Sequence, residues 1–150
     1  MSRFLIISEL QHFSVTLVIA FFLYRRYRDW RLIPICFLFG FFIDIDHWFD
    51  YFAYYGLNIN LAKFFDTASY IEPSGKIYVL LHGWEFIPVF GFIGRVFEKR
   101  LKIKGLVWAV IFSYVAHLLL DYFSFPHHPL SFSFIYRLLN NFSLESFNGI

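Results

Sequence analysis

The chain has 150 residues, of which 59% are hydrophobic, 25% aromatic and only 16% charged. Soluble domains are about 45–50% apolar and about 25% charged, so this composition excludes an ordinary soluble domain and indicates an integral membrane protein. The single cysteine, Cys36, excludes a disulfide framework. The sequence has no internal repeat or long linker, which predicts one helical membrane domain over residues 1–150.

Four apolar stretches predict transmembrane helices, at residues 4–24, 32–52, 77–94 and 105–123. Each approaches the length of about 20 residues that spans a bilayer. The first stretch has a signal peptide as its rival interpretation. However, Glu9, Gln11 and His12 interrupt its apolar run, and Arg25 follows where a small-residue cleavage site should be. We therefore expect a retained helix.

Two further segments are less regular. Residues 61–70 predict a short interfacial helix within the connection 53–76. The tail 124–150 is rich in Phe, Leu and Tyr, and we expect it to lie in the interface or to fold back over the bundle. The predicted fold class is therefore all-α, a polytopic bundle of about four transmembrane helices with short interfacial helices.

The distribution of charge predicts the orientation. The segments 25–31 and 95–104 hold nine of the 13 Lys and Arg residues and two of the 11 acids. With four spans both loops fall on one side, and the positive-inside rule makes that side cytoplasmic. We expect an integral protein of the cytoplasmic (inner) membrane. A nucleic-acid surface is not supported, because the basic residues flank membrane spans.

Four polar residues share one predicted depth. His12, Asp44, His82 and His117 each lie 13 residues from the nearest basic residue of the adjoining basic loop. At a helical rise of 1.5 Å per residue, this places all four about 20 Å above the cytoplasmic charges. The sequence therefore predicts one polar layer toward the outer side of the membrane.

Each predicted helix also carries an acid and a histidine three or four residues apart, and this spacing puts both on one face. The pairs are Glu9/His12, Asp44/His47, His82/Glu85 and His117/Asp121. Bundles build metal sites from such inward-pointing pairs, and mixed carboxylate and imidazole donors suit Zn best, with Mn or Fe as alternatives. We expect one to three ions, with ligands among His12, Asp44, His47, His82, His117, Asp121 and His127.

Other interpretations stay open for individual residues. A single transmembrane histidine is often only hydrogen-bonded to a neighbouring helix. Asp50 is interpreted as a solvated helix end, and one of His127 and His128 as a bystander.

Two motifs resemble the membrane-bound metal-dependent hydrolase family, whose members are associated with the inner membrane. They are Asp44-Ile45-Asp46-His47, which ends the second predicted helix, and His117-Leu-Leu-Leu-Asp121. They stand in succession with the early His12 and with a motif at His82, so that the resemblance covers about residues 10–130. The resemblance implies a ligand pattern similar to that of zinc-dependent phospholipase C, and hence phosphoester hydrolysis. The sequence departs from the family at Ile43, where a proline is usual. It departs again at Leu81–Glu85, where Arg-Gly and a second His are usual.

These observations predict an enzyme that hydrolyses a phosphoester by metal-activated water. Glu85 or Asp46 is the expected catalytic general base. A site at this depth, surrounded by membrane lipid, favours a lipid or lipid-linked phosphate as substrate. A divalent-metal transporter and a non-catalytic structural membrane protein are the alternatives. The cytoplasmic halves of the predicted helices contain no charged residue or histidine, which argues against ion conduction.

Overall fold

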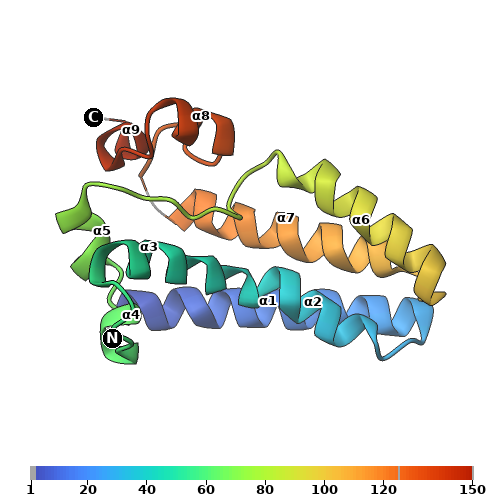
Figure 1. Ribbon diagram of the computed structural model, residues 1–150. Coiled ribbons are helices and arrows are strands. Elements are labelled where there is room, and N and C mark those ends of the chain that lie inside the picture. Colours follow the sequence, from blue (N-terminus) through green and yellow to red (C-terminus); the bar gives the residue numbers. More distant parts are fainter. Residues whose placement is uncertain (1–2, 125, 150) are drawn as a thin grey trace.

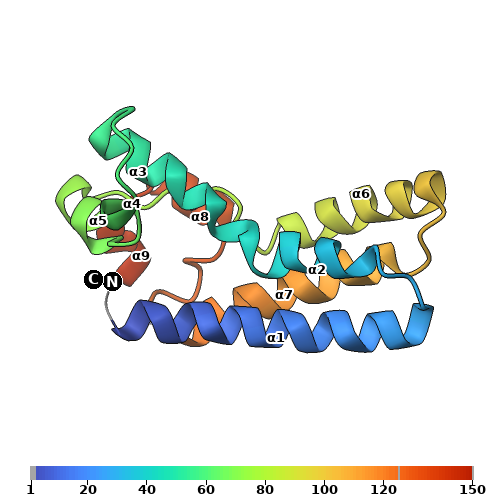
Figure 2. The same cartoon turned by 90° about the horizontal axis from the view of Figure 1, so that it is seen from below.

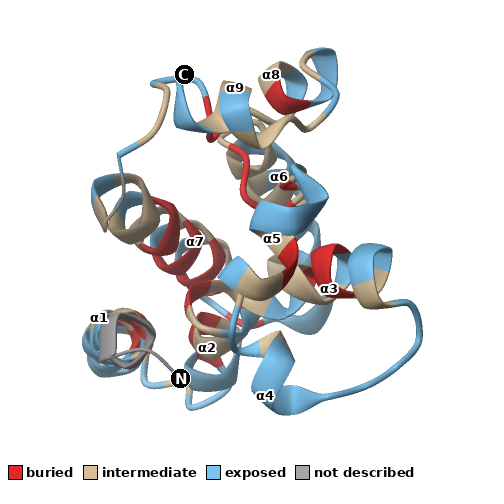
Figure 3. Ribbon diagram, turned by 90° about the vertical axis from the view of Figure 1, so that its left-hand side faces the viewer, coloured by how far each residue is buried: buried red, intermediate tan, exposed pale blue. Residues whose placement is uncertain are grey.

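The computed structural model describes residues 3–124 and 126–149, and their fold is all-α. Four helices form an elongated bundle: α1 (Arg3–Tyr27), α2 (Leu32–Gly40), α6 (Phe86–Leu101) and α7 (Leu106–Ser124) (Figure 1). α7 lies at the centre, because it packs against α1, α2 and α6. Figure 3 shows buried residues along α7, whereas α1 is largely exposed.

Two helical segments are long and apolar enough to cross a membrane, Ile7–Tyr27 and Leu106–Ser124. A third crossing is possible through α2 and the segment Phe42–Tyr55, which meet at a bend of 53°. The predicted four-span bundle is not confirmed. α6 has only 16 residues and carries Lys99 and Arg100 in its last turn.

The predicted continuous helix over 32–52 is wrong, because the chain breaks after Gly40. The 3₁₀-helix η1 (Phe42–Asp46) and then α3 (His47–Tyr55) follow the break. Gly40 packs so closely on α1 that a Cβ atom there would lie 2.5 Å from Thr16 Oγ1. The bend lets α2 keep this contact while α3 diverges from α1 (Figure 2).

The predicted helix over 77–94 is also wrong in its first half. The helix begins only at Phe86, and the segment between residues 77 and 85 is an irregular loop. Side chains supply hydrogen-bond partners to the backbone there. Asp50 accepts bonds from the backbone N–H groups of Tyr78 (2.6 Å) and Val79 (3.1 Å). Backbone N–H groups that are hydrogen-bonded to a side chain do not need the hydrogen bonds of a helix.

The connection and the tail both form short helices. The predicted helix over 61–70 is two elements, α4 (Leu61–Phe64) and α5 (Ala68–Ser74). The tail contains α8 (Phe134–Leu139) and α9 (Leu144–Asn148) and folds back onto the irregular loop. Backbone hydrogen bonds of 2.9 Å join Ile77 N to Phe142 O and Trp84 N to Phe132 O.

Both basic loops lie at one end of the bundle (Figure 1). Tyr27 packs against Gly105 there, at a position where a Cβ would clash with its ring. The core next to these loops is apolar and is formed by residues such as Leu23, Leu32, Cys36 and Leu106. Buried polar residues collect farther along the bundle, beyond this apolar core.

Candidate metal centre

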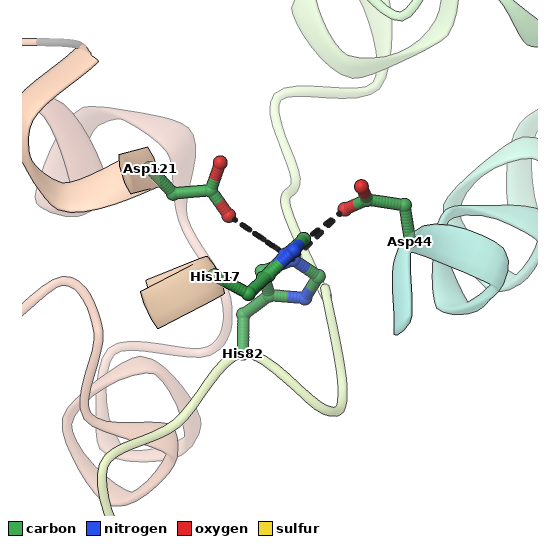
Figure 4. A group of neighbouring side chains, drawn as sticks. All are labelled: Asp44, His82, His117 and Asp121. Carbon is green, nitrogen blue, oxygen red and sulfur yellow. Dashed lines mark hydrogen bonds and ion pairs between the residues drawn. The ribbon is translucent and has the colours of Figure 1, made fainter. Parts of the chain in front are cut away.

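Four side chains converge at one point away from the basic loops: Asp44 of η1, His82 of the irregular loop, and His117 and Asp121 of α7 (Figure 4). Their ligand atoms all lie within 4.8 Å of one another. The two histidines are buried. This cluster, called here the Asp–His cluster, could hold a metal ion.

The distances within the Asp–His cluster are those of a small coordination site. His82 Nε2 lies 3.0 Å from His117 Nε2, 3.1 Å from Asp44 Oδ1 and 3.3 Å from Asp121 Oδ2. His117 Nε2 lies 3.4 Å from Asp44 Oδ1 and 3.1 Å from Asp121 Oδ2. A tetrahedral zinc ion with ligands at 2.0–2.1 Å separates those ligands by about 3.3 Å. The observed spacings therefore fit one such ion.

The second ring nitrogen of each histidine, Nδ1, faces an oxygen atom. His117 Nδ1 lies 3.3 Å from Gly40 O, and His82 Nδ1 lies 3.1 Å from Asp46 Oδ2. Carbonyl and carboxylate oxygens only accept hydrogen bonds, so Nδ1 carries the proton in both rings. In the neutral rings both Nε2 atoms then present lone pairs to the same point, and a proton on either Nε2 would instead be donated to Asp44 or Asp121. Such an arrangement, with Nδ1–H donated to an oxygen, is typical of metal-binding histidines.

The Asp–His cluster consequently needs a cation. Two carboxylates and the Nε2 atoms of two neutral imidazole rings would all be electron-pair donors, and close contact between them is repulsive unless a metal ion or a proton lies among them. The nearby carboxylates favour positive charge at His82, which lies outside the candidate spans. Burial lowers the pKa of His82. The nearby carboxylates outweigh this effect and raise the pKa well above its ordinary value, with the largest contribution from Asp46 and further ones from Asp121 and Asp44.

His12 extends the Asp–His cluster from α1. Its Nε2 lies 3.2 Å from Asp121 Oδ1, and its ring centroid lies 4.3 Å from that of His117. His12 Nδ1 lies 2.9 Å from Ser8 O and therefore carries a proton, which leaves Nε2 as the atom that faces Asp121. The four residues that share one predicted depth therefore meet in space.

A second, smaller group consists of Asp46, His47 and His82. Asp46 Oδ1 and His47 Nδ1 are buried and have no hydrogen-bond partner among the described residues. His47 Nε2 lies 3.8 Å from Asp44 Oδ1. Of the two predicted general bases, Asp46 thus belongs to the site, where one oxygen orients His82 and the other is unpaired.

The other predicted base, Glu85, faces away from the Asp–His cluster. Its carboxylate accepts hydrogen bonds from the Ser133 hydroxyl and from the backbone N–H of Phe134 (3.0 Å) at the start of α8. Burial would raise the pKa of Glu85, but these hydrogen bonds outweigh it and lower the pKa. Glu85 therefore anchors the tail.

His127, predicted as a ligand, packs against Tyr122 and Phe132 and belongs to neither group of possible metal ligands.

Two residues that hold the His82 loop were not predicted. Asp50 is buried at 4% exposure and binds the loop backbone, so its interpretation as a solvated helix end is wrong. Arg137 of α8, at 2% exposure, donates to His82 O (2.7 Å), Ser131 O (2.6 Å) and Val79 O (2.9 Å). Burial lowers the pKa of Arg137 to about 10, so it remains charged at neutral pH. An isolated arginine in an apolar tail was the available sequence signal.

A cavity of about 550 Å³ opens beside the Asp–His cluster. Its polar lining includes His12, Asp44, His82 and Asp121 from the cluster and its extension. The remaining lining is mainly apolar and aromatic and comes from η1, α3, the connection and the tail, with Phe42, Trp48, Phe64, Ile71, Phe132 and Phe147 among its residues. Binding pockets for small molecules are typically of this size and combine apolar walls with a few polar groups.

No protein-family model, curated protein or solved structure matches the chain. The family resemblance therefore stays a prediction, which rests on the motif residues Asp44–His47 and His117–Asp121.

Proposed function

We propose that the protein is a membrane-embedded, metal-dependent hydrolase that cleaves a phosphoester of a lipid or lipid-linked substrate. The observation that carries the proposal is the convergence of two carboxylates with the Nε2 atoms of two histidines, each ring held through Nδ1, beside an open cavity. Asp44, His82, His117 and Asp121 would hold the ion, with His12 within reach of Asp121. Zinc suits this donor set and spacing best.

A divalent ion at this position would supply Lewis-acid polarisation of the phosphoryl group and activation of a water molecule. The chain itself supplies orientation. Asp46 fixes the His82 ring through Nδ1, and the Gly40 carbonyl fixes the His117 ring in the same way. The break after Gly40 brings Asp44 of η1 and the cluster residues of α7 together at the cavity.

Proton transfer requires a titratable side chain that lines the cavity. Glu9 and His47 both do so, whereas Glu85 is engaged at α8. We therefore assign acid–base chemistry to this pair in place of Glu85, with Asp46 as the residue that positions His82. A base must be able to approach the proton that it removes, which favours groups on the cavity wall.

The transporter alternative is disfavoured by the core. Between the Asp–His cluster and the basic loops lies a packed apolar cluster that includes Ala20, Leu23, Cys36 and Val110. A cation would have to cross this region without a carboxylate or imidazole partner, and the cost of placing a charge in such surroundings is high. An ion bound at the cluster is therefore expected to remain there.

The proposal is tested by hydrolysis of a single-chain phosphodiester amphiphile in mixed micelles, followed by ³¹P NMR. The zinc-supplemented protein should add water to the phosphodiester and release a phosphomonoester together with an alcohol. Asp121→Ala should lower the rate more than about 100-fold, because it removes a ligand. Asp66→Ala, which changes an exposed aspartate outside the cavity, is the matched control. Metal-loaded protein with no hydrolysis of phosphodiesters or phosphomonoesters would contradict the proposal.

A further inference from the structure

The lining of the cavity is polar at the Asp–His cluster, called here the polar end of the cavity, and mainly apolar elsewhere. At the polar end lie His12, Asp44, His82 and Asp121. The rest of its lining brings together apolar side chains from distant parts of the sequence: Phe41 and Ile45 around the bend, Phe64 of α4, Ile71 of α5, and Phe132 and Phe147 of the tail. A ligand that contacts both the polar end of the cavity and its apolar lining must itself be amphiphilic.

The apolar wall is continuous with the outer surface of the helices. Phe42 and Ile45 line the cavity, and yet they are 55% and 65% exposed. They lie on η1, within the bent segment that would form a third crossing of the membrane. On α1, the cavity is lined by Ser8, Glu9 and His12, and α3 diverges from this part of α1 (Figure 2). The exposed apolar side chains of the bent segment would face lipid in such a crossing, so the cavity would border the bilayer there.

We infer that the cavity binds one apolar chain of a membrane amphiphile, which enters sideways from the bilayer between α1 and η1–α3 and places its polar end at the Asp–His cluster. The inference rests on the proposed function for the chemistry at the polar end, but binding of the chain does not require hydrolysis. A volume of about 550 Å³ lies within the range of cavities that enclose one small ligand. It therefore suits one chain better than a whole multi-chain lipid.

Trp48 provides a probe inside the cavity, where it stacks on Phe64 with ring centroids 4.1 Å apart. The other tryptophans, Trp30, Trp84 and Trp108, are replaced by Phe. The protein, in micelles of an unbrominated detergent, is titrated with a single-chain phosphodiester amphiphile brominated along its chain. Saturable quenching of Trp48 is expected, because bound chain places bromine beside the indole.

Two matched pairs of variants locate the binding. Ser8→Phe fills the cavity from α1, and Ser14→Phe makes the same change at an exposed position of α1 that does not line it. Ile71→Phe and Ile59→Phe form the second pair. Ile71 lines the cavity, whereas Ile59 is exposed and does not line it. The cavity variants should weaken apparent binding about tenfold or more through overpacking, and the controls should not. Circular dichroism verifies that each variant is folded.

The same titration on Asp44→Ala/His117→Ala separates this inference from the proposed function. Saturable quenching that persists in this double variant supports chain binding even if no metal or hydrolysis is found. Quenching that is linear in amphiphile, or equal in the cavity variants and their controls, would overturn the inference whatever the enzymatic result.

Discussion

The two ends of the helical bundle differ in what holds them together. Next to the basic loops, the core is apolar, and residues such as Leu32 and Cys36 are completely buried there. At the other end, buried Asp, His and Arg side chains bind one another and an irregular loop. The first end requires only shape and hydrophobicity, whereas the second requires each donor to meet its acceptor. This difference indicates that the polar end of the bundle holds functional side chains in fixed positions, at a cost in stability that an apolar core would avoid.

The largest effect is expected from the buried guanidinium that holds the polar end. Arg137→Met leaves the carbonyls of His82, Val79 and Ser131 without their donors. We expect a loss of about 3–5 kcal/mol in the free energy of unfolding, measured in detergent, and weaker metal binding because the His82 loop is released. Arg95→Met removes an exposed ion pair with Glu98 and should cost less than about 1 kcal/mol. Equal losses in the free energy of unfolding for Arg137→Met and Arg95→Met would contradict the difference between the two ends of the bundle.

Truncation in the apolar end should affect stability alone. Leu32 has 0% exposure in the cluster beside the basic loops. Leu32→Ala should lower the free energy of unfolding by about 2–4 kcal/mol, the range for a cavity left in a packed core. Metal content of the folded fraction should be unchanged, and Ile33→Ala, at a more exposed neighbouring position, is the control. Loss of metal with retention of fold would show that the two ends are coupled.

A smaller effect, confined to the metal, is expected from the carboxylate that orients His82. Asp46→Asn retains shape but replaces the charged acceptor at His82 Nδ1. Metal affinity should fall about 10–100-fold, as for other residues that support a ligating histidine. A competition titration with a chromophoric chelator measures this change, with the exposed Asp66→Asn as control. An unchanged affinity would remove Asp46 from the site.

The smallest effect concerns Glu85 and depends on pH. Its folded-state pKa lies below the ordinary value, because the ionised form accepts hydrogen bonds from Ser133 and the start of α8. The contribution to stability is therefore present above the unfolded pKa and disappears as the pH falls through the lowered folded value. Glu85→Gln should cost about 0.5–1 kcal/mol at neutral pH, the scale of a lost helix cap, and the difference should shrink in acid. A difference that does not vary with pH would contradict this role.

The same contrast explains what could be predicted from the sequence. The equal spacing of His12, Asp44, His82 and His117 from the basic loops predicted one polar layer through the helical rise. The four side chains do meet, although His82 lies in an irregular loop and Asp44 lies beyond the break after Gly40, where a continuous α-helical rise does not apply. The break after Gly40 and the loop before Phe86 were not predicted. Hydropathy reports how apolar a segment is, but the hydrogen bonds of Asp50 and the close contact of Gly40 with Thr16 depend on partners distant in sequence. The anchoring roles of Arg137 and Glu85 were missed for the same reason.

Metal content tests the central claim most directly. The detergent-purified protein, reconstituted with Zn, Mn or Fe and then desalted, is analysed by elemental mass spectrometry beside Asp44→Ala/His117→Ala and His128→Ala. His128 stacks on Tyr136 in the tail, outside both groups of possible ligands, and serves as the control. We predict at least one equivalent of metal in the protein and in the control, and its loss in the double variant. A folded protein that holds no metal after reconstitution would contradict the account, and the Asp–His cluster would then be a proton-bridged structural core.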